Sequence, residues 1–177
     1  MLRTLIAYVV NHLTRVLPPT SFYRFKALLY RFAGMQVDRT CRIVSSAQFW
    51  GNLTLEIGKE TFVGHEVFIV GGKSRVLIGS HVDIAPRVLI VTGTHEVDMT
   101  GSRSAGTGYS KDVTIEDGVW IGANTTIIGG VTIGRKSIIG SGSVVTRSIP
   151  PYVIAVGNPC RPVKHWDVDK GWQAIDR

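Results

Sequence analysis

Five histidines are the groups in this chain that can exchange a proton near neutral pH: His12, His65, His81, His95 and His165. His95 differs from the others in its setting, because it lies where an aliphatic run ends and a polar segment from Glu96 to Lys111 begins. A histidine at the edge of a loop is most often a solvated surface residue, and less often a general base that faces a cleft. Position alone therefore makes His95 a candidate base and leaves both interpretations open.

The two cysteines, Cys41 and Cys160, are too few for a disulfide scaffold and fit a reducing compartment. Cys160 lies in the segment Asn-Pro-Cys-Arg, where we expect a small buried residue rather than a nucleophile. The full phosphate-loop pattern that ends in Gly-Lys-Ser is missing, as is a strand-linked Gly-x-Gly-x-x-Gly fingerprint. Nucleotide chemistry of those two kinds is therefore not expected.

The elements that position these residues follow a six-residue rhythm. Aliphatic residues recur in step at Ile115, Ile121, Ile127, Ile133, Ile139 and Val145, and the same spacing occurs at Ile57, Val63, Ile69 and at Ile78, Ile84, Ile90. Short strands, each followed by a turn, bury one aliphatic residue in every six. Three such units form a triangular coil of about 18 residues, and stacked coils form a parallel β-helix. The rhythm slips at Gly71–Arg75 and at Glu96–Lys111, which predicts protruding loops there.

The first 37 residues have a different character, because they contain five basic residues and no acid within a chain of net charge +7. Two amphipathic helices are predicted from the apolar spacing, which is Leu2, Leu5, Ile6, Val9, Leu13 and Val16 in the first and Phe22, Phe25, Leu29 and Phe32 in the second. Pro18-Pro19 is expected to stop the first helix, Ser21 to cap the second and Gly34 to end it. The apolar faces are expected to pack on the rest of the protein or on another subunit, and contact of residues 1–35 with an anionic membrane is the alternative.

The repeat region resembles the hexapeptide-repeat acyltransferases, most closely the branch of galactoside, maltose and polysaccharide O-acetyltransferases. The resemblance covers roughly residues 55 to 165. It is carried by the segments Val119–Ala123, Gly130–Gly134, Ile139–Thr146, Ile149–Pro151 and Gly157–Arg161. It implies a left-handed parallel β-helix, homotrimers, acetyl-CoA as the donor and active sites between neighbouring subunits. The fold expected is thus an all-β left-handed β-helix preceded by two helices, with a helical segment at 1–40, a β-helix domain at 41–165 that carries an extended loop at 96–112, and a tail at 166–177.

His95 matches the position of the family's catalytic histidine, just before the extended loop. Acetyl transfer to a hydroxyl needs a base for the proton, and the resemblance assigns that role to His95. Its second ring nitrogen needs an orienting acceptor, for which Glu96, Asp98, Asp83 or a backbone carbonyl remain open. Glu66 matches a polar substrate contact of the family, while Asp83 is also a candidate for substrate binding and His65 remains possible beside Glu66.

The resemblance also implies a set of coenzyme contacts. Ala123 and Ser141 match positions whose backbone lines the pantetheine arm, and Trp120 matches a residue that packs beside it. The nucleotide end is implied to meet Thr146, Arg147, Arg161 and Lys164, among which the basic side chains suit the phosphates of coenzyme A. Exposed aromatic and basic residues with no ligand are the plainer interpretation of the same positions.

The function expected is a cytoplasmic enzyme that moves an acetyl group from acetyl-CoA to a sugar hydroxyl, and work at the inner face of the membrane is left open. N-acetylation of a nucleotide-linked amino sugar and a non-catalytic β-helix assembly protein are the alternatives. No metal is expected, because no two histidines are five residues apart, as the zinc site of β-helix carbonic anhydrases needs. Nucleic acid is not an expected partner, since basic and aromatic residues gather only near the N-terminus.

Overall fold

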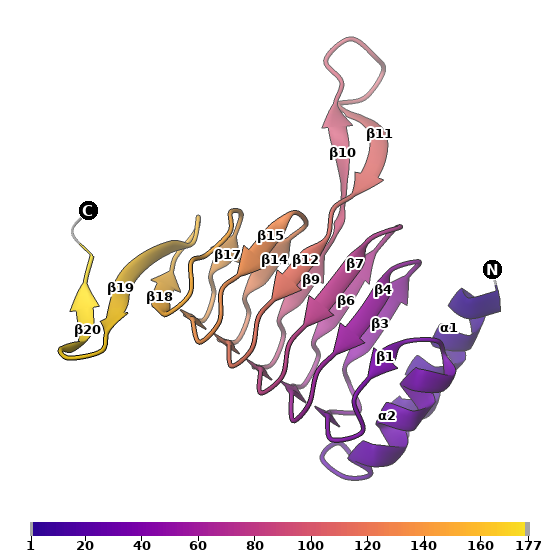
Figure 1. The fold of residues 1–177 in the computed structure, drawn as a ribbon. Helices are drawn as coiled ribbons and strands as arrows, with labels where there is room; N and C mark the ends of the chain where they lie inside the picture. Colours follow the sequence, from indigo (N-terminus) through magenta and orange to yellow (C-terminus); the bar gives the residue numbers. More distant parts are fainter. Residues whose placement is uncertain (1, 176–177) are drawn as a thin grey trace.

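The computed structural model describes residues 2–175, and it places the side chains of residues 4–175. Its body is a stack of coils, with two helices at one end, a pair of antiparallel strands at the other and a hairpin that projects from one edge (Figure 1). The hairpin and the edges between sheets are the parts that carry the candidate site residues.

Three parallel sheets form the faces of the stack, apart from the antiparallel strands at the end of the second. The first contains β1 (Gln36–Val37), β4 (Thr54–Ile57), β7 (Arg75–Ile78), β12 (Val113–Ile115) and β15 (Val131–Ile133). The second contains β2 (Arg42–Ile43), β5 (Phe62–Val63), β8 (Asp83–Ile84), β13 (Trp120–Ile121), β16 (Ile138–Ile139), β18 (Val153–Val156), β19 (Arg161–Asp167) and β20 (Gly171–Ala174). The third contains β3 (Gln48–Gly51), β6 (Phe68–Gly71), β9 (Leu89–Val91), β14 (Thr126–Ile128) and β17 (Val144–Val145). The chain visits the sheets in turn, so each strand pairs with its equivalent one coil away.

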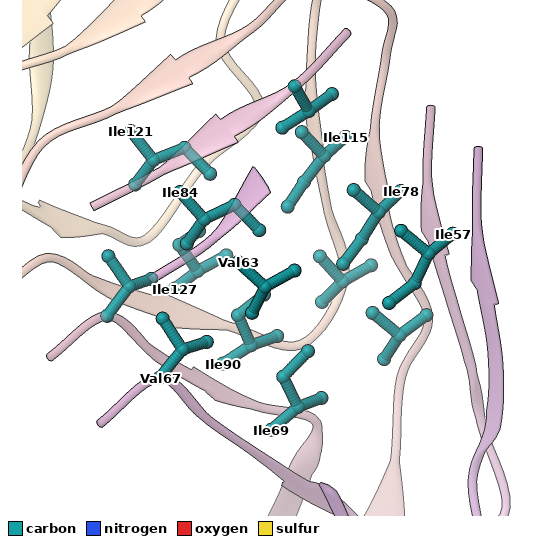
Figure 2. Close-up of a cluster of buried hydrophobic side chains, with 14 of the residues drawn as sticks. Ile57, Val63, Val67, Ile69, Ile78, Ile84, Ile90, Ile115, Ile121 and Ile127 are labelled. Carbon is teal, nitrogen blue, oxygen red and sulfur yellow. The ribbon is translucent and has the colours of Figure 1, made fainter. Parts of the chain in front are cut away.

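The core is the column of aliphatic residues that the six-residue rhythm predicts (Figure 2). In the first sheet Ile57 pairs with Ile78, Ile78 with Ile115, and Ile115 with Ile133. All six residues of the run from Ile115 to Val145 are buried. The rhythm thus identified an inward position correctly for each strand of that run, and the three-residue strands β12 and β15 each bury a second side chain, Val113 and Val131.

Glycine stands beside some of these residues because successive coils approach closely at the edges. A Cβ atom on Gly122 would lie 2.5 Å from the backbone nitrogen of Ser141, and one on Gly134 would lie 2.4 Å from that of Pro151. Real carbon atoms do not approach backbone atoms so closely. A side chain at either position would force two coils apart.

The two helices, α1 (Leu2–Arg15) and α2 (Tyr23–Phe32), lie where the sequence predicts them. Gly34 follows the second helix with a φ of 83°, and its N–H donates to the carbonyl of Arg31 at 2.9 Å, so it ends that helix as expected. The prediction of Ser21 as N-cap is wrong. Phe22 occupies that position in a left-handed conformation, without a side-chain cap. The buried Lys26 ammonium instead donates to the carbonyls of Pro18 and Pro19, and this fixes the turn before the helix.

Most residues of the expected apolar faces do not pack against the coils, although Ile6 and Leu29 are partly buried against the core. The buried residues are Ala7, Val10, Asn11 and Thr14 in α1 and Lys26, Ala27 and Tyr30 in α2, whereas most of the predicted apolar residues are exposed. The reason lies in the open edge of β3, whose backbone needs polar partners. Asn11 supplies them, since its Nδ2 donates to the Phe49 carbonyl at 2.9 Å and its Oδ1 accepts from the Phe49 N–H at 3.3 Å.

Two further segments differ from their expected form. The polar segment after His95 is not a plain loop, since β10 (Gly93–Val97) and β11 (Ala105–Ser110) pair as an antiparallel hairpin. Residues after 165 continue β19 and form β20, which add antiparallel strands to the second sheet. Trp166 and Trp172 meet edge to face there, with ring centroids 5.3 Å apart. Strand β19 thus covers the edge of β18 that no further coil covers. The six-residue rhythm does not predict this pairing.

Candidate functional site

His95 lies on β10, exposed to solvent at the base of the hairpin. Its Nδ1 lies 2.9 Å from the carbonyl oxygen of Gly106. A carbonyl oxygen can only accept a hydrogen bond, so the proton of the neutral ring belongs on Nδ1. Nε2 then presents a lone pair to the surroundings, which is the form that a general base requires.

The hairpin holds this histidine through its own pairing. His95 lies opposite Gly108, and the register shifts between His95 and Val97, which forms a bulge beside the ring. At the tip, Asp98 accepts hydrogen bonds from the N–H groups of Thr100 and Gly101 and from the Thr100 hydroxyl. These bonds hold the pKa of the Asp98 carboxyl below its usual value and fix the turn.

A hollow of about 480 Å³ lies at the foot of the hairpin, along the edge between the third and first sheets. It is lined by Ser110, Lys111, Asp112, Thr114 and Gly130–Thr132. The Lys111 ammonium lies 5.5 Å from the centre of the Tyr109 ring, and the Ser110 hydroxyl accepts from the N–H of Gly72 at 3.2 Å. The hairpin is thus tied to the coils before and after it.

Thr146 and Arg147 lie on the same edge as His95. They follow β17 of the third sheet directly, two coils after β9, and both are exposed. Arg147 therefore places a positive charge on this edge, two coils away from the coil that leads into His95.

Ala123, Ser141 and Glu66 lie on a different edge, between the second and third sheets. Ala123 and Ser141 occupy successive coils, and the N–H of Gly142 donates to the Ala123 carbonyl at 2.8 Å. Glu66 lies two coils earlier and is paired with Arg87, whose Nε lies 2.8 Å from the carboxylate. His65 beside it contacts the Ser46 hydroxyl at 3.3 Å.

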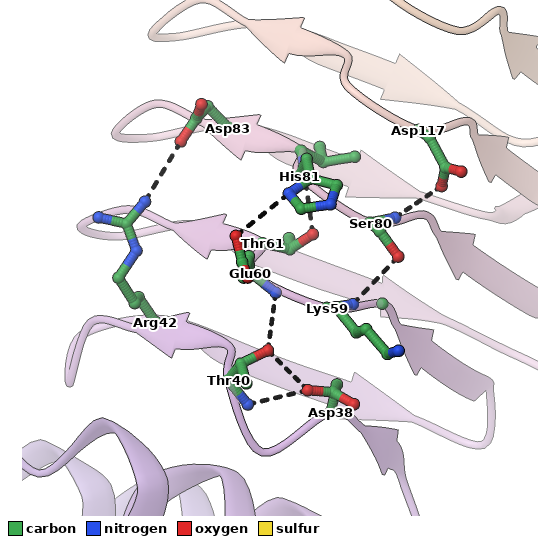
Figure 3. Close-up of polar contacts among 12 residues, drawn as sticks. Asp38, Thr40, Arg42, Lys59, Glu60, Thr61, Ser80, His81, Asp83 and Asp117 are labelled. Atoms are coloured by element: carbon green, nitrogen blue, oxygen red, sulfur yellow. Dashed lines mark hydrogen bonds and ion pairs between the residues drawn. The ribbon is translucent and has the colours of Figure 1, made fainter.

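Trp120 and Asp83 are neighbours on the outer face of the second sheet. Trp120 pairs with Asp83 across β13 and β8, and its indole is about half exposed. The Asp83 carboxylate lies 3.8 Å from the Arg42 guanidinium (Figure 3). Further along the same sheet, β19 carries Arg161 and Lys164, both exposed.

The edge between the first and second sheets carries contacts of a structural kind (Figure 3). His81 Nδ1 lies 3.4 Å from the Glu60 carboxylate, and the Glu60 N–H donates to the Thr40 hydroxyl at 2.8 Å. Such contacts join each turn to the turn one coil away. They account for His81 without any chemical role.

Within one chain the predicted residues therefore divide between separate edges and one face of the prism. His95, Thr146 and Arg147 share one edge, whereas Ala123 and Ser141 lie on another. A hollow of about 650 Å³ lies between the C-terminal end of α2 and the first sheet, and none of the predicted site residues lines it. The sequence misses the contact of the Arg87 guanidinium with Glu66, and it leaves a backbone carbonyl open as the partner of His95 without identifying Gly106. A carbonyl has no side-chain signal, but Arg87 follows Glu66 by one coil and could have been found from the coil spacing.

The remaining groups that could do chemistry are the two thiols and the side chains that could hold a metal ion. Cys41 and Cys160 are both buried, as expected for Cys160, and burial raises the pKa of the Cys41 thiol to about 11. No group of three or more His, Cys, Asp or Glu side chains in the described part of the chain is arranged to hold a metal ion. None of the described helices is both long and apolar enough to cross a bilayer.

Comparisons with known proteins agree with this architecture. Residues 112–147 match the family model described as bacterial transferase hexapeptide (six repeats). The chain is 42% identical to a galactoside O-acetyltransferase of Escherichia coli (strain K12) over 110 residues, which are 62% of this chain and 53% of that protein. It is 46% identical to a galactoside O-acetyltransferase of Lactococcus lactis over 85 residues, 48% of this chain and 41% of that protein. The match thus spans about half the length of these curated relatives.

Solved structures extend the similarity to nearly the whole chain. A maltose O-acetyltransferase from Clostridium difficile 630 is 30% identical with a TM-score of 0.70, and the match covers 92% of this chain and 86% of that one. A hexapeptide-repeat acetyltransferase from Vibrio cholerae, solved with acetyl coenzyme A, is 26% identical with a TM-score of 0.67 and covers 93% of this chain and 87% of that one. The stacked coils, the sequence repeat and this similarity together show that the chain is a left-handed parallel β-helix and belongs to the hexapeptide-repeat acetyltransferase family.

Proposed function

We propose that this protein transfers an acetyl group from acetyl-CoA to a hydroxyl group of a sugar, with His95 as the general base. The observation that carries the proposal is the hydrogen bond from His95 Nδ1 to the Gly106 carbonyl, which leaves Nε2 free to accept a proton. Relatives named as galactoside and maltose O-acetyltransferases support both the acetyl group and the sugar.

Nε2 of His95 accepts the proton of the acceptor hydroxyl as its oxygen attacks the thioester carbonyl. A tetrahedral oxyanion forms, and a backbone N–H donates to it. The carbon–sulfur bond then breaks, the thiolate leaves and the imidazolium returns the proton to the sulfur. The acetyl group passes directly to the sugar, so no residue of the protein carries it.

In this proposal two kinds of residue hold the coenzyme: small residues that leave space for the pantetheine arm and basic residues that bind the phosphates. Ala123 and Ser141 present small side chains at one edge, where backbone groups pair with the amides of the pantetheine arm, and Trp120 packs beside it. Arg147, Arg161 and Lys164 are exposed, and with Thr146 they meet the nucleotide. Their charges suit its phosphates. Glu66 and Asp83 act in substrate binding, each beside an arginine.

The site is complete, on this view, only between subunits of a homotrimer. His95 and the pair of Ala123 and Ser141 lie on different edges of one prism, and a rigid stack of coils cannot bring two edges together. A second copy can place its coenzyme edge beside the first copy's histidine edge. Head-to-tail contacts of that kind close into a ring, and three copies form the smallest ring beyond a dimer.

A product screen tests the function. Purified protein, acetyl-CoA and a panel of hydroxyl sugars and nucleotide-linked amino sugars are incubated, and products are identified by mass spectrometry. We expect a mass gain of one acetyl group on a hydroxyl sugar with release of free thiol. Acetylation of amino sugars alone would overturn O-acetylation in favour of N-acetylation. No product together with no binding of acetyl-CoA by calorimetry would identify a non-catalytic assembly protein.

The location we propose is the cytoplasm. Cys41 and Cys160 are buried and form no disulfide, which fits a reducing compartment. Work at the inner face of the membrane requires that residues 1–35 contact lipid.

A further inference from the structure

The outward faces of the two N-terminal helices are apolar. The exposed residues Leu5, Val9 and Leu13 recur at spacings of four, which places them along one side of α1, and the exposed Val16 follows directly after the helix. In α2 the exposed residues Phe25, Leu28 and Phe32 form a second stripe. Val16 and Phe32 are 81% and 76% exposed, which is unusual for large apolar side chains on the outside of a single chain.

Both stripes point away from the stack of coils. The helices rest side by side on the first coil, α1 against β3 and α2 against β1 and β2, and together they cover its open end (Figure 1). Their inner faces already contact the first coil. Asn11 donates a hydrogen bond to the backbone of Phe49, and the ring centroids of Tyr30 and Phe49 lie 4.7 Å apart. The residues of the outer stripes therefore have no place in the core, and their apolar surface points outward at this end of the molecule.

Every charged residue of the two helices is basic, and the first acid after them, Asp38, lies close enough to Arg31 to interact with it. Arg15, Arg24 and Arg31 are exposed, and the sequence has no acid before Asp38. On α2, Arg24 and Arg31 are separated by seven residues, so they lie on one flank of the stripe formed by Leu28 and Phe32. An apolar face bordered by arginines is the pattern of a helix that lies in the surface of an anionic bilayer.

We propose that the two N-terminal helices form a membrane-binding surface, with the apolar stripes inserted among lipid chains and the arginines on anionic head groups. A second copy of this chain is a poorer occupant, since two such faces would bring Arg15 and Arg24 of each copy together, and neither helix carries an acid to offset them. The proposal does not depend on acetyl transfer, because it concerns the end of the stack opposite the C-terminal strands and none of the residues assigned to the reaction.

Flotation with vesicles tests the surface in the full-length chain. Deletion of residues 1–35 would also remove Asn11 and Tyr30 from the core, so point substitutions are the better probe. We expect the protein to float with vesicles of phosphatidylcholine and about one third phosphatidylglycerol, and much less with pure phosphatidylcholine. Substitution of Val9, Leu13 and Phe32 by Gln should weaken the binding about 100-fold, because three apolar side chains no longer insert.

A matched pair of charge variants isolates the arginines. Arg15→Gln with Arg24→Gln should weaken binding to anionic vesicles about 30-fold. Arg103→Gln with Lys170→Gln removes the same charge from distant exposed positions and should change binding less than about threefold. The proposal is overturned if the unaltered protein does not float, or if both charge pairs weaken it equally. It is also overturned if the apolar variant leaves flotation unchanged and alters the mass in sedimentation equilibrium, since another copy would then cover the face.

Discussion

His95 is oriented by a backbone carbonyl rather than by a carboxylate. The hydrogen bond to Gly106 fixes the tautomer and the plane of the ring without placing a negative charge beside it. Of the acceptors that remained open from the sequence, the carbonyl is the one the structure supports. The carboxylates have other partners, since Asp98 caps the hairpin tip and Asp83 faces Arg42. The orientation of the candidate base therefore depends on the hairpin being folded.

Substitution of this base gives the first prediction. His95→Asn should lower kcat by about 10²–10⁴-fold, because the hydroxyl loses its proton acceptor, while acetyl-CoA binding is retained. Steady-state kinetics with the acceptor found in the product screen, and calorimetry with acetyl-CoA, measure the two effects.

His81→Asn is the matched control. His81 is also exposed, has a φ of 57° that asparagine tolerates, and contacts Glu60 far from the hairpin. It should keep near-normal activity. Equal activity of both variants would remove His95 from the mechanism.

Tyr30 gives a prediction about stability and pH. Burial raises the pKa of its phenol to about 12, against about 10 in an unfolded chain. Its contribution to stability is complete below pH 10, where the phenol is neutral in both states. It is lost as the pH rises towards 12, because the unfolded chain gives up the proton first, and the loss is about 2–3 kcal/mol.

Urea unfolding of the unaltered chain and of Tyr30→Phe at pH 9 and pH 11.5 measures this. We expect Tyr30→Phe to be less stable at pH 9, where it lacks the hydroxyl contacts to Thr14 and Ala47, and the difference to shrink at pH 11.5. A difference that stays constant over this range would contradict the pKa assigned to the phenol.

At the scale of the elements, each strand is too short to be stable alone, and coil-to-coil contact is what defines it. The six-residue rhythm predicts an inward position for every strand in the run from Ile115 to Val145, because side chains alternate between the interior and the surface and the strands recur at a fixed spacing. The three-residue strands β12 and β15 each bury a second side chain, Val113 and Val131. The same argument fails for the helices. The exposed backbone groups of the end coil determine which face of each helix turns inward. Asn11 and Thr14 are therefore buried, although hydrophobic periodicity predicts that the leucines of the helix are buried instead.

The coil spacing predicts a cost at the glycine edges. Gly122→Ala should lower the free energy of unfolding by about 1–3 kcal/mol, since the new Cβ meets the Ser141 backbone, which cannot move without shifting a coil. Gly93→Ala is the matched control, because its Cβ would meet nothing closer than 3.9 Å. Urea denaturation of both variants compares them. Equal stabilities would show that the coils can separate at this edge at little cost.

For the whole molecule, the division of the candidate residues between separate edges is the basis of the proposed site between subunits. If His95 of one subunit works beside the coenzyme edge of the next, two different inactive variants can complement each other. His95→Asn removes the base, and Ser141→Trp fills the place of the pantetheine arm.

Co-expressed variants test this directly. In trimers assembled at random from equal amounts of the two, about one quarter of the sites combine an intact His95 with an intact coenzyme edge. We therefore expect about one quarter of the unaltered activity from the mixture and almost none from either variant alone. Activity no higher than that of the single variants would confine each site to one chain. Sedimentation equilibrium of the unaltered protein measures the trimer independently.

Residue types and spacing alone predict the β-helix, its inward residues, the two helices and the position of His95 at a break in the rhythm. These features are local or strictly periodic, so spacing and residue type are enough to find them. Three other features are seen only in the folded chain: the segment after His95 is a hairpin, Gly106 orients the ring, and the helices turn their apolar stripes outward. Each of these depends on backbone groups that every residue carries alike, and where such groups find their partners is fixed by how distant parts of the chain meet.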